Sequence, residues 1–155
     1  MKIKVELTIK KPVQEVWEVM GSQFGYADKW SSNFKTSKPG GEARFRGLDY
    51  SLRDTTTDRG NTVQELTAFD RDRYTLSYVI SKGAPEIAKM AGADWSLHSE
   101  SENATMLSMD FFMEPKMTLT AEMEAKLKMG LTASVQELAE ELKFYLETGN
   151  PLIQD

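Results

Sequence analysis

The sequence predicts an α+β domain in which an open antiparallel sheet curls around one long C-terminal helix. From about residue 33 to 113, short strand-like segments alternate with turn residues, and beyond Pro115 the apolar residues recur at helical spacing. A sheet of this kind and an amphipathic helix can bury both their apolar faces if the sheet wraps the helix. With 155 residues, the chain is most simply one domain, 1–155, which is long enough to bury a proper core.

The N-terminal segment predicts one strand and two short helices. Over residues 2–10 every second side chain is apolar, at Ile3, Val5, Leu7 and Ile9. Pro12 then suits a first helical position, where its missing N–H group costs nothing. One helical stripe follows at Val13, Val16, Trp17 and Met20. Gly21 is placed to end this helix, and Ser22 can cap a second one, which faces inward with Phe24, Ala27 and Trp30.

The middle of the chain predicts the strands of the sheet. Turn residues at 39–41 precede an expected strand at 42–48, and the polar stretch 49–61 leaves room for a short strand at 50–53. The remaining expected strands are 62–69, 74–80, 93–99 and 105–113. The tetrapeptide DRDR at 70–73 has the length of a hairpin loop, and 82–90 is expected to be a loop.

The C-terminal segment predicts a helix of roughly six turns. Its apolar residues are spaced by three or four, at Met123, Leu127, Leu131, Val135, Leu138, Leu142 and Tyr145. Gly149 and Pro151 form a typical stop signal.

Three stretches in this order resemble the SRPBCC superfamily: VWEVMGSQFGYADKW, VQELTAFDRDRYTLSYVISKGAP and KFYLETG. The superfamily includes polyketide cyclase/dehydrase-like proteins, and START lipid-transfer domains and the birch-pollen allergen are distant relatives. The resemblance covers nearly the whole chain. It implies a helix-grip fold, with six or seven strands wrapped around the C-terminal helix, two short helices after the first strand closing one end, and an apolar cavity between sheet and helix.

Arg44 and Glu65 are candidate polar groups at such a cavity. If Val63, Glu65 and Phe69 share one face, Glu65 lies among residues that face a core, and a buried carboxylate needs a partner. Arg44, on the preceding expected strand, could supply it across the sheet. The resemblance also implies an Arg and a Glu beside the cavity. A structural ion pair, a solvated rim pair and a ligand anchor are all open, because a slip of one residue reverses the face of Glu65.

Large apolar side chains supply the other candidate ligand-binding residues. They are Trp17, Phe24, Trp30, Tyr78, Trp95, Met109, Phe111, Met123, Leu127 and Leu131. Each of them could equally be ordinary core. Apolar walls with few polar groups are nevertheless typical of small-molecule sites, and methionine adapts its shape to varied ligands.

Composition argues against several other functions. The chain has no cysteine and one histidine, His98, which is expected on an outer strand face, so neither a metal nor another cofactor is expected. A net charge of −5 argues against nucleic-acid binding. No apolar run is long enough to span a bilayer, and no signal segment is evident, so we expect no integral membrane association and a cytoplasmic monomer or homodimer.

The favoured hypothesis is the binding or transport of a small hydrophobic or aromatic molecule, without catalysis, because no catalytic machinery is legible. Two alternatives stay open. A cyclase- or dehydrase-type enzyme would use Glu65 or a pocket tyrosine as acid or base, and would require an inward Glu65 without a satisfying arginine. A protein-interaction module would show a filled interior and an exposed apolar patch.

Overall fold

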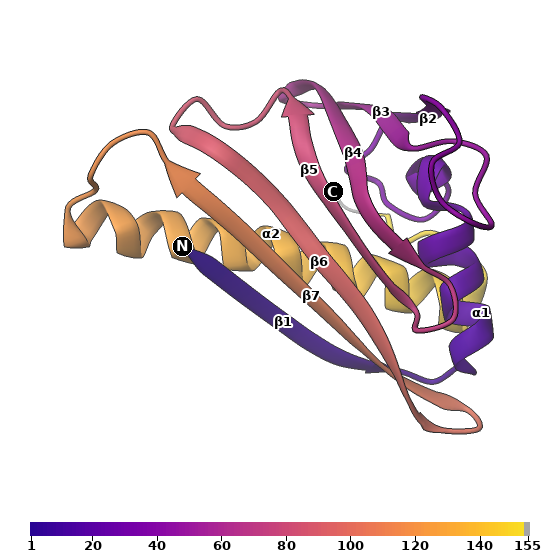
Figure 1. Ribbon diagram of the computed structural model, residues 1–155. Helices are drawn as coiled ribbons and strands as arrows, with labels where there is room; N and C mark the ends of the chain where they lie inside the picture. Colours follow the sequence, from indigo (N-terminus) through magenta and orange to yellow (C-terminus); the bar gives the residue numbers. More distant parts are fainter. Residues whose placement is uncertain (154–155) are drawn as a thin grey trace.

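The computed structural model describes residues 1–153, which form one sheet, one long helix and a group of short helical turns (Figure 1). The strands are β1 Lys2–Ile9, β2 Thr36–Gly40, β3 Leu52–Thr57, β4 Gly60–Asp70, β5 Thr75–Lys82, β6 Ala88–Ser101 and β7 Ala104–Pro115. The helical elements are α1 Val13–Trp17, the π-helical turn η1 Glu18–Ser22, the 3-10 helix η2 Phe24–Lys29 and α2 Ala121–Thr148. The predicted α+β class, with the long helix last, is confirmed.

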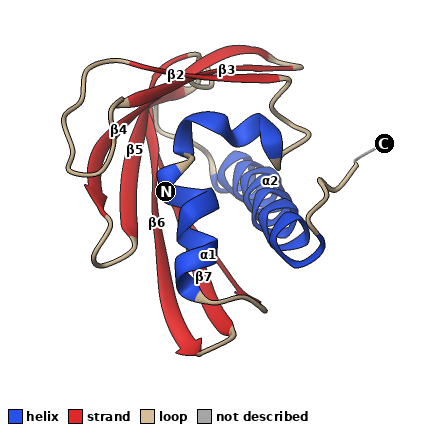
Figure 2. Cartoon of the chain, turned by 90° about the vertical axis from the view of Figure 1, so that its right-hand side faces the viewer, coloured by secondary structure: helices blue, strands red, loops and turns tan. Residues whose placement is uncertain are grey.

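The seven strands form one antiparallel sheet in the order β1-β7-β6-β5-β4-β3-β2. Strands β2 to β7 each pair with their neighbours in sequence, whereas β1 pairs with β7 and so joins the two ends of the sheet-forming chain. The sheet curves around α2, which lies on its concave side (Figure 2). This is the helix-grip arrangement that the resemblance to the SRPBCC superfamily implies.

The short helices after β1 pack their apolar side chains into the core. The residues predicted to face inward are all buried: Val13, Val16, Trp17, Met20, Phe24, Ala27 and Trp30. The prediction that Gly21 ends the first helix is wrong, because Gly21 lies inside η1. A Cβ atom at this position would lie 2.5 Å from Cε2 of Trp17, so glycine is what allows the indole ring to pack directly against the turn.

The predicted strand at 42–48 is wrong. These residues form a loop with an isolated bridge between Phe45 and Leu48, while β2 lies earlier in the chain and pairs with β3. Gly41 and Gly47 adopt positive φ angles of 79° and 87°. Because glycine tolerates this left-handed region, the chain turns at both ends of the loop before a strand can extend.

Helix α2 ends at the predicted stop, but with 28 residues it is longer than the predicted six turns. Its N-cap is Thr120, whose hydroxyl accepts a hydrogen bond from the backbone N of Met123 at 3.2 Å, and Gly149 ends it with a φ of 80°. Burial along the apolar stripe is uneven, because Leu142 is fully buried whereas Met123 is 46% exposed. Residues 121–126 are all exposed, so the core contains mainly the C-terminal half of α2. None of the helices within residues 1–153 is both long and apolar enough to cross a membrane.

A buried carboxylate, Glu141, fixes this C-terminal half to the loop that follows η2. Its Oε1 accepts hydrogen bonds from Ser31 Oγ at 2.8 Å and Asn33 Nδ2 at 2.9 Å. Its Oε2 accepts bonds from the backbone N and the hydroxyl of Ser32, both at 2.8 Å. Four donors therefore satisfy a fully buried side chain that would otherwise be costly to desolvate.

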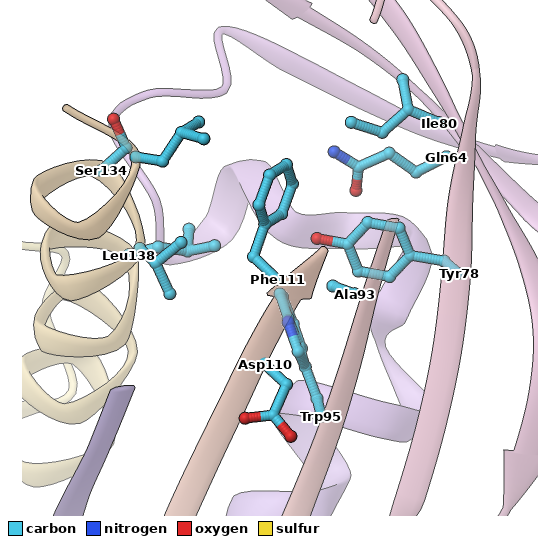
Figure 3. Close-up of a pocket in the computed structure, with 11 residues that line it drawn as sticks. Gln64, Tyr78, Ile80, Ala93, Trp95, Asp110, Phe111, Ser134 and Leu138 are labelled. Atoms are coloured by element: carbon cyan, nitrogen blue, oxygen red, sulfur yellow. The ribbon is translucent and has the colours of Figure 1, made fainter. Parts of the chain in front are cut away.

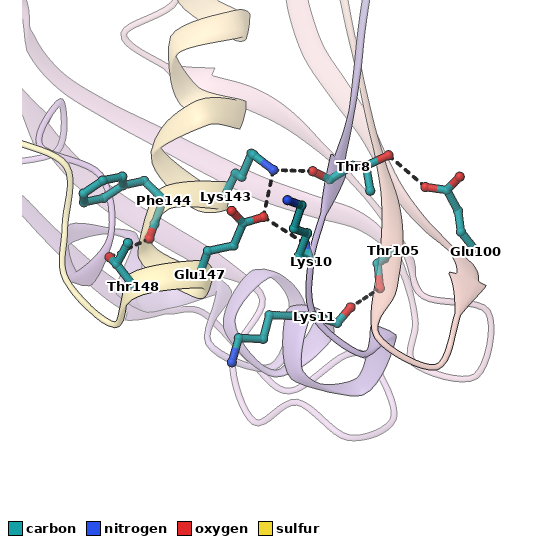
Figure 4. Close-up of polar contacts among 9 residues, drawn as sticks. All are labelled: Thr8, Lys10, Lys11, Glu100, Thr105, Lys143, Phe144, Glu147 and Thr148. Atoms are coloured by element: carbon teal, nitrogen blue, oxygen red, sulfur yellow. Dashed lines mark hydrogen bonds and ion pairs between the residues drawn. The ribbon is translucent and has the colours of Figure 1, made fainter.

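A second carboxylate, Glu147, fixes the end of α2 to the end of β1 (Figure 4). Its Oε2 accepts hydrogen bonds from Lys143 Nζ at 2.7 Å and from Lys10 N at 2.8 Å, and Lys143 also donates to Thr8 O. Burial raises the pKa of the Glu147 carboxyl, but these hydrogen bonds and the two lysine charges outweigh burial, so the pKa lies below its ordinary value of 4.5.

This contact makes stability dependent on pH in the acid range. A carboxyl whose pKa is lowered by folding stabilises the fold above its ordinary pKa, and the stabilisation is lost as the pH falls through the folded-state value. We expect Glu147→Gln to reduce the free energy of unfolding by about 1 kcal/mol at pH 7 and by much less once the pH is below that value. Urea unfolding across this pH range measures the difference. Glu102→Gln, at an exposed position, should leave the free energy of unfolding unchanged at both ends of this pH range. If Glu147→Gln lost the same free energy of unfolding at both ends, the prediction would be contradicted.

Candidate functional site

A cavity of about 160 Å³ lies between the concave face of the sheet and α2 (Figure 3). Strands β4 to β7 supply one wall and α2 the other. The lining residues are Gln64, Tyr78, Ile80, Ala93, Trp95, Asp110, Phe111, Leu131, Ser134, Val135 and Leu138. Most of them are apolar, so the cavity favours an apolar or aromatic body.

A second hollow adjoins this cavity along α2. It measures about 380 Å³ and shares Ser134 and Leu138 with the cavity. Its other lining residues come from the loop after η2, the turn between β3 and β4, and α2: Asn33, Phe34, Thr57, Asp58, Arg59 and Glu137. The hollow is more polar than the cavity, so a ligand reaching from one to the other would pass from apolar to polar surroundings.

Two polar side chains, Gln64 and Tyr78, stand on the sheet wall of the cavity. They lie on adjacent strands, where alternation places the buried Gln64 and Leu66 of β4 beside the buried Tyr78 of β5. The ring of Tyr78 is held edge-on by Trp95, with centroids 5.5 Å apart at 82°. In Figure 3 the Tyr78 hydroxyl and the Gln64 amide both point from the sheet toward α2.

Behind this wall lies a buried arginine, Arg53, on β3. It is 1% exposed, and its Cζ lies 4.0 Å from the centroid of the Phe24 ring and 5.4 Å from those of Phe34, Tyr78 and Trp95. Its Nε donates to Gln64 Oε1 at 2.7 Å, and its Nη1 donates to the Phe24 carbonyl at 3.0 Å. Its Nη2 makes no hydrogen bond to any described residue, and no described carboxylate lies within ion-pair distance of it.

Arg53 remains charged despite its burial. Loss of solvation lowers the pKa of its guanidinium from its ordinary value to about 10, which still leaves the group protonated at neutral pH. Burial likewise raises the pKa of the Tyr78 hydroxyl, and the adjacent guanidinium opposes that rise. The site thus combines a neutral phenol with a buried cation that has no carboxylate partner in the described part of the chain.

Arg44 and Glu65 form an ion pair, but it lies outside this cavity. Arg44 Nη1 and Glu65 Oε1 are 3.1 Å apart, with 54% and 32% of the side chains exposed. Glu65 points to the outer face of the sheet, between the inward Gln64 and Leu66. A register shift between Leu66 and Ala68 then returns Phe69 to the core side, where its ring lies 5.1 Å from that of Trp17.

The other candidate ligand-binding residues divide into three groups. Tyr78, Trp95, Phe111 and Leu131 line the cavity. Trp17, Phe24, Trp30 and Met109 are buried in the main core without lining it. Leu127 and Met123 lie toward the N-terminal end of α2, where Leu127 packs on a small cluster around Ala91 and Met113, and Met123 is largely exposed.

Sequence reasoning missed the most unusual residues of the site. Arg53 and Gln64 fall on strands with polar alternation, where hydrophobicity does not indicate the inner face. On β3, Arg53 and Thr55 follow Ser51, which lies just before the strand, and on β4 Gln64 stands beside Glu65. Glu141 did leave a signal, because it lies three residues from Leu138 and next to Leu142 on the helical stripe. His98 lies on the outer face of β6, as predicted, and within residues 1–153 no three His, Asp or Glu side chains converge as metal ligands.

The chain is similar to a known protein family in sequence and to known proteins in structure. A family model described as "Polyketide cyclase / dehydrase and lipid transport" matches residues 1–146. No curated protein matches the sequence. Among solved structures, a START superfamily protein from Mycobacterium smegmatis is similar with a TM-score of 0.77 and 13% identity, over 96% of this chain and 99% of its own.

Two further structures have similar scores. An uncharacterised protein from Bacillus thuringiensis has a TM-score of 0.72 and 15% identity, over 95% of this chain and 99% of its own. The protein XoxI from Bacillus cereus has a TM-score of 0.71 and 16% identity, over 95% and 96%. At these identities the likeness concerns the fold.

Proposed function

Because the chain belongs to the polyketide cyclase/dehydrase and lipid transport family of the SRPBCC superfamily, we propose that it binds a small hydrophobic or aromatic molecule between the sheet and α2. The observation that supports this most directly is the cavity itself, whose wall contains Trp95, Phe111 and Leu131. Apolar walls with a few inward polar groups are typical of sites that bind small molecules.

The volume of the cavity limits the size of the ligand. At about 160 Å³ it is comparable to an engineered apolar cavity of ~150 Å³ in another protein that accepts benzene, and it lies below the ~300–1,000 Å³ of typical sites for drug-sized ligands. We therefore expect one aromatic ring or an equally small apolar group inside the cavity. Any larger ligand would extend into the adjoining hollow past Ser134 and Leu138.

The proposal is tested by filling the cavity from α2. Leu131 is half-buried and faces the sheet, so Leu131→Trp should occupy the space and abolish binding of p-xylene, followed by ligand-observed NMR and by the shift in melting temperature. Met129→Trp adds the same ring two residues away at a position that is 75% exposed, and should bind like the parent protein. Failure of the parent protein to bind p-xylene or any similar one-ring probe would contradict the proposal.

The two alternatives differ in what the cavity offers them. Glu65 faces outward and is paired with Arg44, so the enzyme alternative would depend on the pocket tyrosine, Tyr78. The interaction-module alternative requires a filled interior, whereas a cavity is present. Exposed methionines do occur before α2, at Met117, and in its first half, at Met123 and Met129.

A further inference from the structure

The buried guanidinium of Arg53 has no counter-charge in the part of the chain that the structure describes. Buried charges in proteins are normally paired with an opposite charge, because an unpaired ion loses several kcal/mol of hydration. Arg53 has instead two neutral acceptors and the faces of four aromatic rings, and its Nη2 is left without a hydrogen bond. Its stabilisation is therefore incomplete, and the cavity lies just beyond Gln64 and Tyr78.

The contact with Arg53 determines which end of the Gln64 amide faces the cavity. A guanidinium has hydrogen-bond donors only, so the amide oxygen of Gln64 must be the atom that receives Arg53 Nε at 2.7 Å. The Nε2 group, which carries two hydrogens, is then left for the cavity, where Gln64 is a lining residue. The Gln64 amide could otherwise present either its oxygen or its NH2 group, and Arg53 thus leaves it to act toward the cavity as a hydrogen-bond donor.

The same charge orients the Tyr78 hydroxyl. The guanidinium lies beside the Tyr78 ring, and a nearby cation attracts the oxygen end of the O–H dipole. The hydroxyl proton is then directed away from Arg53, toward the cavity. Burial raises the pKa of Tyr78, so the phenol keeps this proton at neutral pH. Two donors therefore face the cavity from adjacent strands, with a cation behind both.

Asp110, the acidic residue of the lining, does not face the two donors. Asp110 alternates with Phe111 along β7, so its side chain belongs to the other face of the strand, where Oδ1 lies 3.8 Å from Lys4 Nζ. In Figure 3 its carboxylate points away from Gln64 and Ile80. The sheet wall at Gln64 and Tyr78 is thus a donor surface that no acceptor among residues 1–153 fills.

We propose that the ligand of this cavity carries a carboxylate on its small apolar or aromatic body, and that the carboxylate is held by Gln64 Nε2–H and the Tyr78 hydroxyl in front of Arg53. The inference rests on the proposed function, which it extends from an apolar ligand to an apolar acid. Arg53 acts as a positioning residue, because it does not line the cavity but orients both donors and supplies the opposite charge. A carboxylate suits two donors, since it has two oxygens that only accept hydrogen bonds.

The experiment uses three probes of nearly the same shape: p-xylene, p-toluamide and p-toluate. Their dissociation constants are measured by calorimetry on the whole chain. We expect p-toluate to bind at least about tenfold more tightly than p-toluamide, because hydrogen bonds to a charged group are stronger than those to a neutral one. If all three bind equally, the carboxylate inference is wrong and the proposed function stands. If none binds, both are wrong.

Variants then distinguish the effect of the hydrogen-bond donors on binding from the effect of the cavity's shape. Tyr78→Phe keeps the ring but removes the hydroxyl. It should weaken the binding of p-toluate about tenfold and leave the dissociation constant of p-xylene unchanged. Arg53→Met should remove the preference of p-toluate over p-toluamide, whereas Arg71→Met, at an exposed arginine in the turn between β4 and β5, should preserve it. Retention of the preference in both Arg53→Met and Tyr78→Phe would overturn the assignment, and Tyr78→Phe alone provides the test if Arg53→Met does not fold.

Discussion

Replacing Glu141 by alanine should reduce the free energy of unfolding by about 3–5 kcal/mol. The change removes the acceptor for four hydrogen bonds from residues 31–33, where Ser31 is buried and Ser32 and Asn33 are exposed, and it leaves a cavity in place of a fully buried side chain of α2. The serine hydroxyls can rotate toward other acceptors, but the backbone N–H group of Ser32 cannot. Because whole domains are stable by only ~5–15 kcal/mol, the loss is a large share of the total, and urea unfolding monitored by tryptophan fluorescence should show it clearly.

The neighbouring residue provides a matched control for this change. Glu140 is exposed and makes one hydrogen bond, with Gln136 Nε2 at 3.1 Å, so Glu140→Ala should cost no more than about 0.5 kcal/mol. Similar losses for the two variants would show that the loop donors find other partners, and that Glu141 does not hold the loop to the helix. Glu141→Gln should lie between the two, since its amide retains one acceptor but places a donor opposite the others.

Replacing Trp95 by alanine should also cost about 3–5 kcal/mol, as large-to-small changes at buried aromatic residues generally do. Trp95 is 2% exposed, holds the Tyr78 ring edge-on, and is one of the four rings around Arg53. The variant loses the buried area of the indole, one cation–π contact, and the wall that separates the cavity from the core. Urea unfolding measures the loss.

Phe144→Ala is the corresponding control, because Phe144 lies on α2 with 37% of its surface exposed. It should change the free energy of unfolding by less than about 1 kcal/mol. If Trp95→Ala were as mild as this control, the surrounding side chains would have to collapse into the vacated space, and Trp95 would not be needed to hold the Tyr78 ring at the cavity wall.

The elements with strong periodicity could be predicted from the sequence. The inward face of β1 follows from alternation, and the burial of Trp17 and of the C-terminal half of α2 follows from spacings of three and four residues. The resemblance to SRPBCC proteins then supplied the way in which the sheet and the helix pack. The pairing of Arg44 with Glu65 was also foreseen, although Arg44 lies in a loop.

The polar part of the site could not be predicted, for two physical reasons. On β3 and just before it, the inner residues Ser51, Arg53 and Thr55 are as polar as the outer ones, so the alternation does not show which face is the inner one. On β4 the register shift after Leu66 places Glu65 and Phe69 on opposite faces although they are four residues apart. Alternation along the sequence cannot reveal such a shift, because after the shift the side chains that face inward fall on the other set of alternate residues.

The uneven burial of α2 has a consequence for how its backbone opens. The first turns, at residues 121–126, contribute almost nothing to the core, whereas Ala139, Glu141 and Leu142 are completely buried. Gly130 lies between these regions, directly before the cavity residue Leu131, and glycine weakens a helix interior by ~1 kcal/mol relative to alanine. Local unfolding should therefore begin at Ala121 and reach Gly130 at a small fraction of the global free energy. Amide hydrogen exchange along α2 would then be graded, and the cavity would gain an entrance each time the first turns unwind while the anchored half stays folded.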